Sequence, residues 1–125
     1  MKISKRQLRR IIREATIGVY AGSDETPSVR DVVDWCRSIG MDISERGYHP
    51  YPTVCTLQFD HDEDHPGHME ISAHRNMSLG RNFIKGDIYD LDLETGRKKY
   101  HVKQRNLHSI KDMNDLLGEF LEKYQ

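Results

Sequence analysis

The chain has 125 residues, of which 36% are hydrophobic and 31% charged, so it has room for one domain with one modest core. It lacks an apolar run near the ~20 residues of a membrane-spanning helix, and no membrane partner is expected. The basic start also lacks the apolar stretch of a secretory signal peptide, because Arg13 and Glu14 directly follow Ile11 and Ile12.

Charge is distributed unevenly along the chain. Residues 1–14 hold six lysines and arginines against a single glutamate, a balance of +5. The remaining residues hold 13 basic side chains against 19 acidic ones, a balance of −6. This asymmetry indicates two segments with different roles.

The basic segment, residues 1–15, predicts an amphipathic helix. Ser4 and Gln7 have the spacing of a capping box, and Ile3 and Leu8 have that of a hydrophobic staple. One apolar stripe follows at helical spacing and consists of Leu8, Ile11, Ile12 and Ala15. The loop-like composition of the next residues, 16–26, predicts a linker to the rest of the chain.

Residues 27–125 are predicted to form a single α+β domain that opens with a helix. Thr26 is expected as its N-cap, Pro27 as its first helical residue and Gly40 as its end. Trp35 is expected at the edge of the apolar stripe. The stripe itself consists of Val29, Val32, Val33, Cys36 and Ile39.

Alternation of apolar and polar side chains then predicts four strands, at residues 53–60, 68–75, 83–91 and 98–104. The inward side chains of the first two strands are expected to be Cys55, Leu57, Phe59, Met69, Ile71 and Ala73. In the fourth strand, Tyr100 and Val102 should share one face. Turn residues at Pro66-Gly67 and Glu94-Thr95-Gly96 favour an antiparallel meander.

A C-terminal helix completes the predicted fold. Ser109 is its expected N-cap, with Asp112 three residues later. Its apolar stripe consists of Ile110, Met113, Leu117, Phe120, Leu121 and Tyr124. The predicted order is α-β-β-β-β-α, a four-stranded antiparallel meander flanked by two helices, which are most simply placed on one face.

The chain has two cysteines, Cys36 and Cys55, and both fall on predicted apolar faces. Two cysteines are too few for a disulfide scaffold, so we expect buried free thiols. The sequence contains no GxSxG, P-loop, HExxH or paired CxxC motif, and it marks no nucleophile–base pair. We therefore expect no catalytic residues and no cofactor.

The leader MKISKRQLRRIIREA resembles the short lysine- and arginine-rich leaders that open many otherwise unrelated proteins of large tailed bacteriophages. Within it, Ile12-Arg13-Glu14-Ala15 resembles the site cut by the prohead protease of T-even-like phages: an aliphatic residue, any residue, glutamate and a small residue. The resemblance implies targeting into the assembling head, recognition of Ile12 and Glu14, and cleavage of the Glu14–Ala15 bond.

Two other interpretations of the leader stay open. A basic helix can dock on the acidic body of its own or a neighbouring chain. Residues 2–13 can also contact nucleic acid or a membrane surface through their arginines.

Residues 60–68 hold three imidazoles and several carboxylates, which are possible ligands for a first-row metal. The imidazoles are those of His61, His65 and His68. Their spacing does not match that of zinc fingers or zinc-binding helices, and the segment joins two predicted strands. A loop of solvated charges is the simpler interpretation, with a metal site as the alternative.

Six basic side chains are candidates for contact with an anion or a partner protein: His74, Arg75, Arg81, Lys85, Lys99 and Lys103. The first four surround the turn between the second and third predicted strands, and the last two lie on the fourth strand. Lysines on an edge strand also prevent association between sheets, which is the simpler explanation for that pair. We find no interleaved aromatic residues of the kind that single-strand nucleic-acid binders use.

These features favour a non-enzymatic, phage-encoded accessory protein found in the virion or the host cytoplasm. Packaging with the genome would bring it to host factors early, so a host or defence protein is its expected partner. A nucleic-acid-associated module, using the leader arginines and residues 97–105, is the alternative. A metal-dependent hydrolase or nuclease that uses the histidine-rich loop is a third. The oligomeric state is left open.

Overall fold

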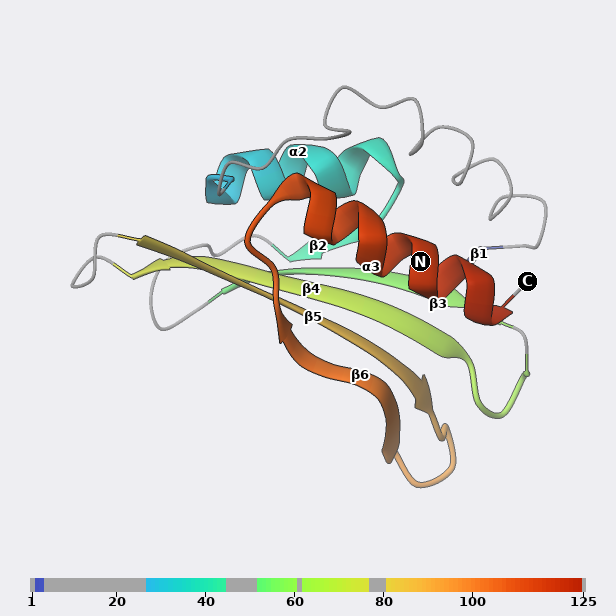
Figure 1. Cartoon of the computed structure of the whole chain (residues 1–125). Helices are drawn as coiled ribbons and strands as arrows, with labels where there is room; N and C mark the ends of the chain where they lie inside the picture. Colours follow the sequence, from blue (N-terminus) through green and yellow to red (C-terminus); the bar gives the residue numbers. More distant parts are fainter. Residues whose placement is uncertain (1, 4–26, 45–51, 61, 77–80, 125) are drawn as a thin grey trace.

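An antiparallel sheet with two helices on one of its faces forms the part of the chain that the computed structural model describes (Figure 1). The described residues are 2–3, 27–44, 52–60, 62–76 and 81–124. Their elements are β1 (Lys2–Ile3), α2 (Val29–Ser38), β2 (Asp42–Ser44), β3 (Thr53–Phe59), β4 (Gly67–Asn76), β5 (Arg81–Leu91), β6 (Lys98–Asn106) and α3 (Ile110–Tyr124). The α+β class predicted from the sequence is therefore confirmed.

Helix α2 begins later than predicted, because Ser28 rather than Thr26 is its N-cap. The Ser28 hydroxyl accepts a hydrogen bond from the Asp31 amide at 3.1 Å, and the Asp31 carboxylate accepts one from the Ser28 amide at 3.2 Å. This reciprocal capping box satisfies two amides at once, which a threonine before Pro27 would not do. Pro27 consequently precedes the cap instead of occupying the first helical position.

The predicted end of α2 at Gly40 is confirmed. Gly40 has a φ of +78°, a left-handed conformation that glycine adopts without steric cost. Its amide donates to the carbonyl of Arg37 at 3.1 Å, and the Met41 amide donates to that of Cys36 at 3.0 Å. These two hydrogen bonds form the Schellman motif that ends many helices.

Trp35 lies in the core, not at the edge of the stripe as predicted. Only 2% of its surface is exposed, and its indole N–H donates to the side-chain oxygen of Asn114 on α3 at 2.9 Å. A buried indole needs such an acceptor. The sequence pattern of α2 alone could not reveal it, since Asn114 comes from the other helix.

The predicted meander is present as β3, β4, β5 and β6, each antiparallel to the next. Two short strands that we did not predict share the outer edge of β3. β2 pairs antiparallel with residues 54–56 of β3, and β1 pairs parallel with the last two residues of β3, Gln58 and Phe59. Such short strands show no alternation, so periodicity misses them. Lys2 and Ile3 therefore belong to the sheet, and they precede Ser4, the predicted cap of the leader helix. Residues 4–15 of that leader lie outside the described residues.

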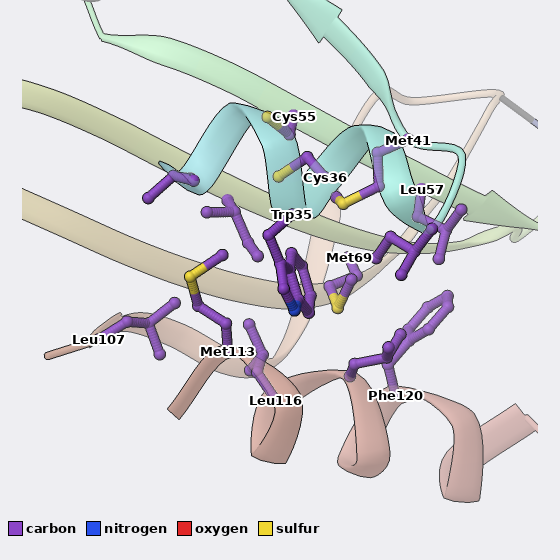
Figure 2. Close-up of a cluster of buried hydrophobic side chains, with 14 of the residues drawn as sticks. Trp35, Cys36, Met41, Cys55, Leu57, Met69, Leu107, Met113, Leu116 and Phe120 are labelled. Atoms are coloured by element: carbon purple, nitrogen blue, oxygen red, sulfur yellow. The ribbon is translucent and has the colours of Figure 1, made fainter. Parts of the chain in front are cut away.

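The core lies between the sheet and both helices (Figure 2). The predicted inward side chains of β3 and β4 are all buried, as is the predicted stripe of α3. The predicted cap of α3 is also confirmed, because the Ser109 hydroxyl accepts from the Asp112 amide at 3.1 Å. No described helix is long and apolar enough to cross a membrane.

The two cysteines face each other across the packing of α2 on β3 (Figure 2). Both are free and fully buried, as predicted. A hydrogen bond to Cys55, together with burial, raises the pKa of the Cys36 thiol far above its usual range. These thiols thus behave as small apolar core residues.

Candidate functional site: the open sheet face

One face of the sheet is left uncovered by the two described helices, which both pack on the opposite face (Figure 1). We call it the open face. Because side chains alternate along a strand, it carries the residues between the core positions of the meander. These include Thr56, Gln58, His68, Glu70, Ser72, His74, Phe83, Lys85, Asp87, Tyr89 and Tyr100.

A row of aromatic rings crosses the open face from β4 to β6. His68 and Tyr89 are cross-strand neighbours whose rings stack with 5.0 Å between centroids and 5° between planes. Tyr89 in turn pairs with Tyr100, and their centroids are 5.6 Å apart. His68 and Tyr89 are only 7% and 5% exposed, whereas Tyr100 is 38% exposed. Tyr100 is therefore the ring of this row that a ligand can reach.

The ring of Tyr100 lies on the open face because β6 is irregular. Val102 pairs with Ile88 and packs against the core, while Tyr100 pairs with Tyr89, so one extra residue of β6 stands between the two pairs. Such a bulge reverses the side-chain alternation. The prediction that Tyr100 and Val102 share a face is therefore wrong.

Two lysines of β6 lie over these rings. The Lys98 ammonium is 4.7 Å from the Tyr89 centroid, and the Lys103 ammonium is 5.0 Å from the Tyr100 centroid. Both distances are within the range of cation–π attraction. Aromatic and basic side chains thus interleave here, contrary to our expectation: the β5–β6 hairpin places Lys98 over Tyr89, and Lys103 lies over Tyr100 of its own strand.

Two carboxylates, Glu70 and Asp87, stand directly opposite each other in the middle of the open face. Burial raises the pKa of Glu70; Asp87 raises it further, while the charge of Lys98 acts in the opposite direction. Burial and the same two carboxylates contribute to raising the pKa of Tyr89 to about 12. Asp87 also accepts a 2.6 Å hydrogen bond from the amide of Gln104, whose φ is +48°. It therefore helps to hold the irregular part of β6.

The predicted basic residues form two separate groups. His74 and Lys85 lie on the open face near the β4–β5 connection, with the His74 ring stacked on Phe83 at 5.6 Å. Arg75, near the end of β4, is exposed, and the side chain of Arg81 is not among those that the structure describes. The second group, Lys99 and Lys103, lies on the exposed strand β6.

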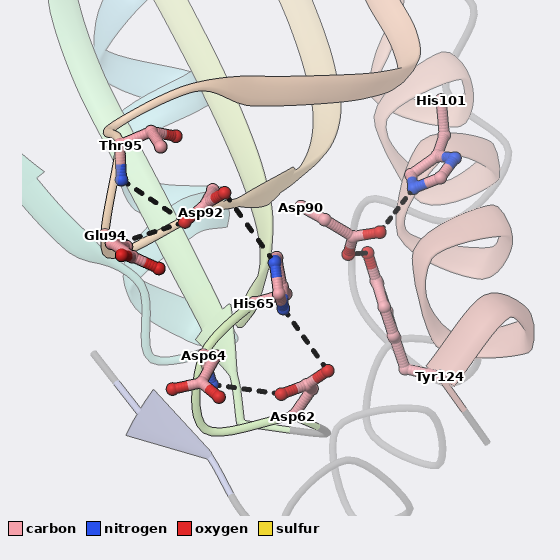
Figure 3. A network of polar contacts seen from close by, with 9 residues as sticks. All are labelled: Asp62, Asp64, His65, Asp90, Asp92, Glu94, Thr95, His101 and Tyr124. Carbon is pink, nitrogen blue, oxygen red and sulfur yellow. Dashed lines mark hydrogen bonds and ion pairs between the residues drawn. The ribbon is translucent and has the colours of Figure 1, made fainter.

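The described histidines of the proposed metal loop have different surroundings. His65 contacts the carboxylates of Asp62 at 3.4 Å and Asp92 at 3.8 Å (Figure 3). His68 instead stacks on Tyr89, and its Nδ1 bonds to the carbonyl of Pro66 at 3.2 Å. His61 lies outside the described residues. Among the described side chains, no group of three or more His, Cys, Asp or Glu is placed to hold a metal.

The same end of the sheet is reinforced by a network around Asp90 (Figure 3). Its carboxylate accepts from the Tyr124 hydroxyl at 2.6 Å and lies 2.8 Å from the Nε2 atom of His101. Burial and this carboxylate raise the pKa of Tyr124 well above its usual range. These contacts join the end of α3 to β5 and β6, two of the strands that form the open face.

Ile12, Glu14 and Ala15, the predicted processing residues, lie outside the described residues. No family model, curated protein or solved structure matches the chain. The row of aromatic rings on the open face was missed from the sequence because its rings lie on three strands. One signal was available: the alternation that buries Ile88 places the aromatic Tyr89 on the other face of β5.

Proposed function

We propose that this protein is a non-enzymatic, phage-encoded interaction module that binds a host or defence protein through its open face. One observation carries the proposal: the open face combines accessible and half-buried aromatic rings, Tyr100 and Phe83, with side chains of both charges. Aromatic residues are enriched at protein interfaces, and a polar rim commonly surrounds them. A sheet face that served only as a solvated surface would need no such rings.

A test of the open face uses the double variant F83A/Y100A. We expect it to lose proteins that co-purify with the wild type from host cells, measured by quantitative mass spectrometry. The matched control is K111A/E122A, which removes two exposed side chains from α3. Circular dichroism verifies that both variants are folded. An unchanged set of partners for F83A/Y100A would contradict the proposal.

The leader is the second part of the proposal: it would deliver the protein into the virion and be removed there. Its support is the resemblance of residues 1–15 to phage leaders and of residues 12–15 to a prohead-protease site. Intact-mass measurement of the protein from virions should find a chain that starts at Ala15. The variant E14Q keeps the size of the side chain but removes its charge, so it should stay uncleaved. Normal maturation of E14Q would eliminate this site.

A nucleic-acid-associated module is the second candidate, and the interleaving of Lys98, Tyr100 and Lys103 favours it. Single-strand binders combine basic side chains with rings on which bases stack. A single-stranded oligonucleotide should then bind with an affinity that falls steeply with salt and depends on Tyr100. Salt-independent or absent binding would remove this candidate.

A further inference from the structure

Strand β6 is the long free edge of the sheet. It ends the strand order, and within the described residues no strand pairs with its outer edge. The opposite edge, on β3, is occupied by β2 and β1. β6 spans nine residues, of which only Val102 is not exposed. Its outer N–H and C=O groups are therefore available to another strand.

The charge of this edge is uniform. Residues 97–106 contain five lysines and arginines and no aspartate or glutamate. Internal contacts hold several of these side chains in place: Lys98 and Lys103 lie over tyrosine rings, and Arg105 forms a bidentate pair with Glu119 of α3. The charge of Arg105 is balanced by Glu119, and Lys98 and Lys103 give the edge positive charge at fixed positions.

This charge discriminates between possible occupants. A second copy of β6 would place lysines and arginines opposite one another, which destabilises a strand pair. An acidic strand would instead place carboxylates opposite them, so the same residues that prevent self-association favour one class of partner. The bulge at residue 101 and the irregularity around Gln104 leave residues 98–100 as the regular stretch for pairing.

We propose that residues 98–100 of β6 accept an extended acidic segment of a partner protein as an additional strand. Main-chain hydrogen bonds would hold the segment, and the carboxylates on its open-face side would lie near Lys98 and Lys103, whose ammonium groups lie over the tyrosine rings of that face. This inference rests on the proposed protein-binding function and names the chemistry of the partner. It places the contact on the sheet edge that adjoins the open face.

The test uses a short peptide of alternating glutamate and valine, with a lysine–valine peptide as control. Binding to the full chain is measured by calorimetry at low salt, and hydrogen–deuterium exchange follows the amides of β6. We expect the acidic peptide to bind and to slow exchange at residues 98–100. K98E/K103E should weaken binding roughly tenfold or more. K111E/K123E, which makes the same change of net charge on α3, should bind as the wild type does.

Three results would overturn the inference. The first is acidic-peptide binding without slowed exchange in β6, and the second is equal binding to both charge-reversal variants. The third is no peptide binding, including the case in which a single-stranded oligonucleotide protects β6 instead. The F83A/Y100A experiment tests the open face separately, so a failure of the strand proposal and a failure of the proposed function give different results.

Discussion

Gly67 and Tyr124 show how one small residue determines the packing at the end of the sheet where β4 begins and Asp90 lies. The Tyr124 ring lies against the backbone of Gly67 and extends its hydroxyl to Asp90, the residue that pairs with Gly67 across β4 and β5. A side chain at position 67 would occupy the space of the ring. Glycine is therefore required here for close approach and not for an unusual backbone conformation.

The variant G67A should destabilise the protein by ~1–3 kcal/mol, the usual cost of overpacking. Its Cβ would lie 2.7 Å from the Tyr124 hydroxyl oxygen and closer still to the ring. Urea unfolding measures the change. G118A is the matched control. A Cβ at Gly118 meets no atom within 4 Å, so alanine at this position of α3 should raise the free energy of unfolding by ~0.5–1 kcal/mol. Equal effects of the two variants would contradict this packing.

Glu70 should make stability depend on pH. Its pKa is raised above the ordinary 4.5 by burial and by Asp87. A carboxyl with a raised folded-state pKa favours the folded protein while it is protonated, and this contribution is lost as the pH rises through that pKa. The variant E70Q stays neutral, so it should match the wild type at acid pH and be more stable at neutral pH.

Urea unfolding of E70Q and of the wild type across this pH range measures that difference. The control is E122Q on α3, where the carboxyl is exposed. A stability gain of E70Q that is the same at every pH would show that ionisation of the buried Glu70 carboxyl is not its cause.

At the scale of elements, α3 contributes more buried hydrophobic side chains to the core than any other described helix or strand. Seven of its side chains are buried, and Phe120 is fully so. The Phe120 ring also packs edge-on against Tyr124, with 5.0 Å between centroids. Because the helix covers both β4 and β5, a loss of packing in α3 affects the whole sheet.

F120A should therefore cost ~3–5 kcal/mol, a large share of the ~5–15 kcal/mol that stabilises an ordinary domain. The expected result is a much lower urea midpoint or insoluble protein. E122A, on the exposed side of the same helix, should behave as the wild type does. A wild-type midpoint for F120A would show that α3 packs elsewhere.

At the scale of the whole molecule, the leader should be nearly dispensable for folding. Of residues 1–14, only Lys2 and Ile3 contribute a described element, the two-residue strand β1 at the edge of β3. Deleting residues 1–14 removes that pairing but no described core side chain. The thermal midpoint should fall by less than ~5 °C, measured by calorimetry. A fall of tens of degrees would show that the apolar stripe of the leader is part of the core.

The sequence alone determined the elements whose patterns are local and long. Helix α3, the core faces of β3 and β4, the end of α2 at Gly40 and the burial of both cysteines all follow from periodicity and from capping residues. These signals are reliable because a single element carries each of them, and its own side chains determine which face it buries.

Only the tertiary structure decided the rest. The burial of Trp35 depends on Asn114 of the other helix, and the position of Tyr100 depends on a bulge against β5. β1 and β2 exist because the edge of β3 binds them, and the aromatic row exists because three strands bring its rings together. Each of these features is an interaction between segments distant in sequence, and a pattern within one segment contains no information about its partner.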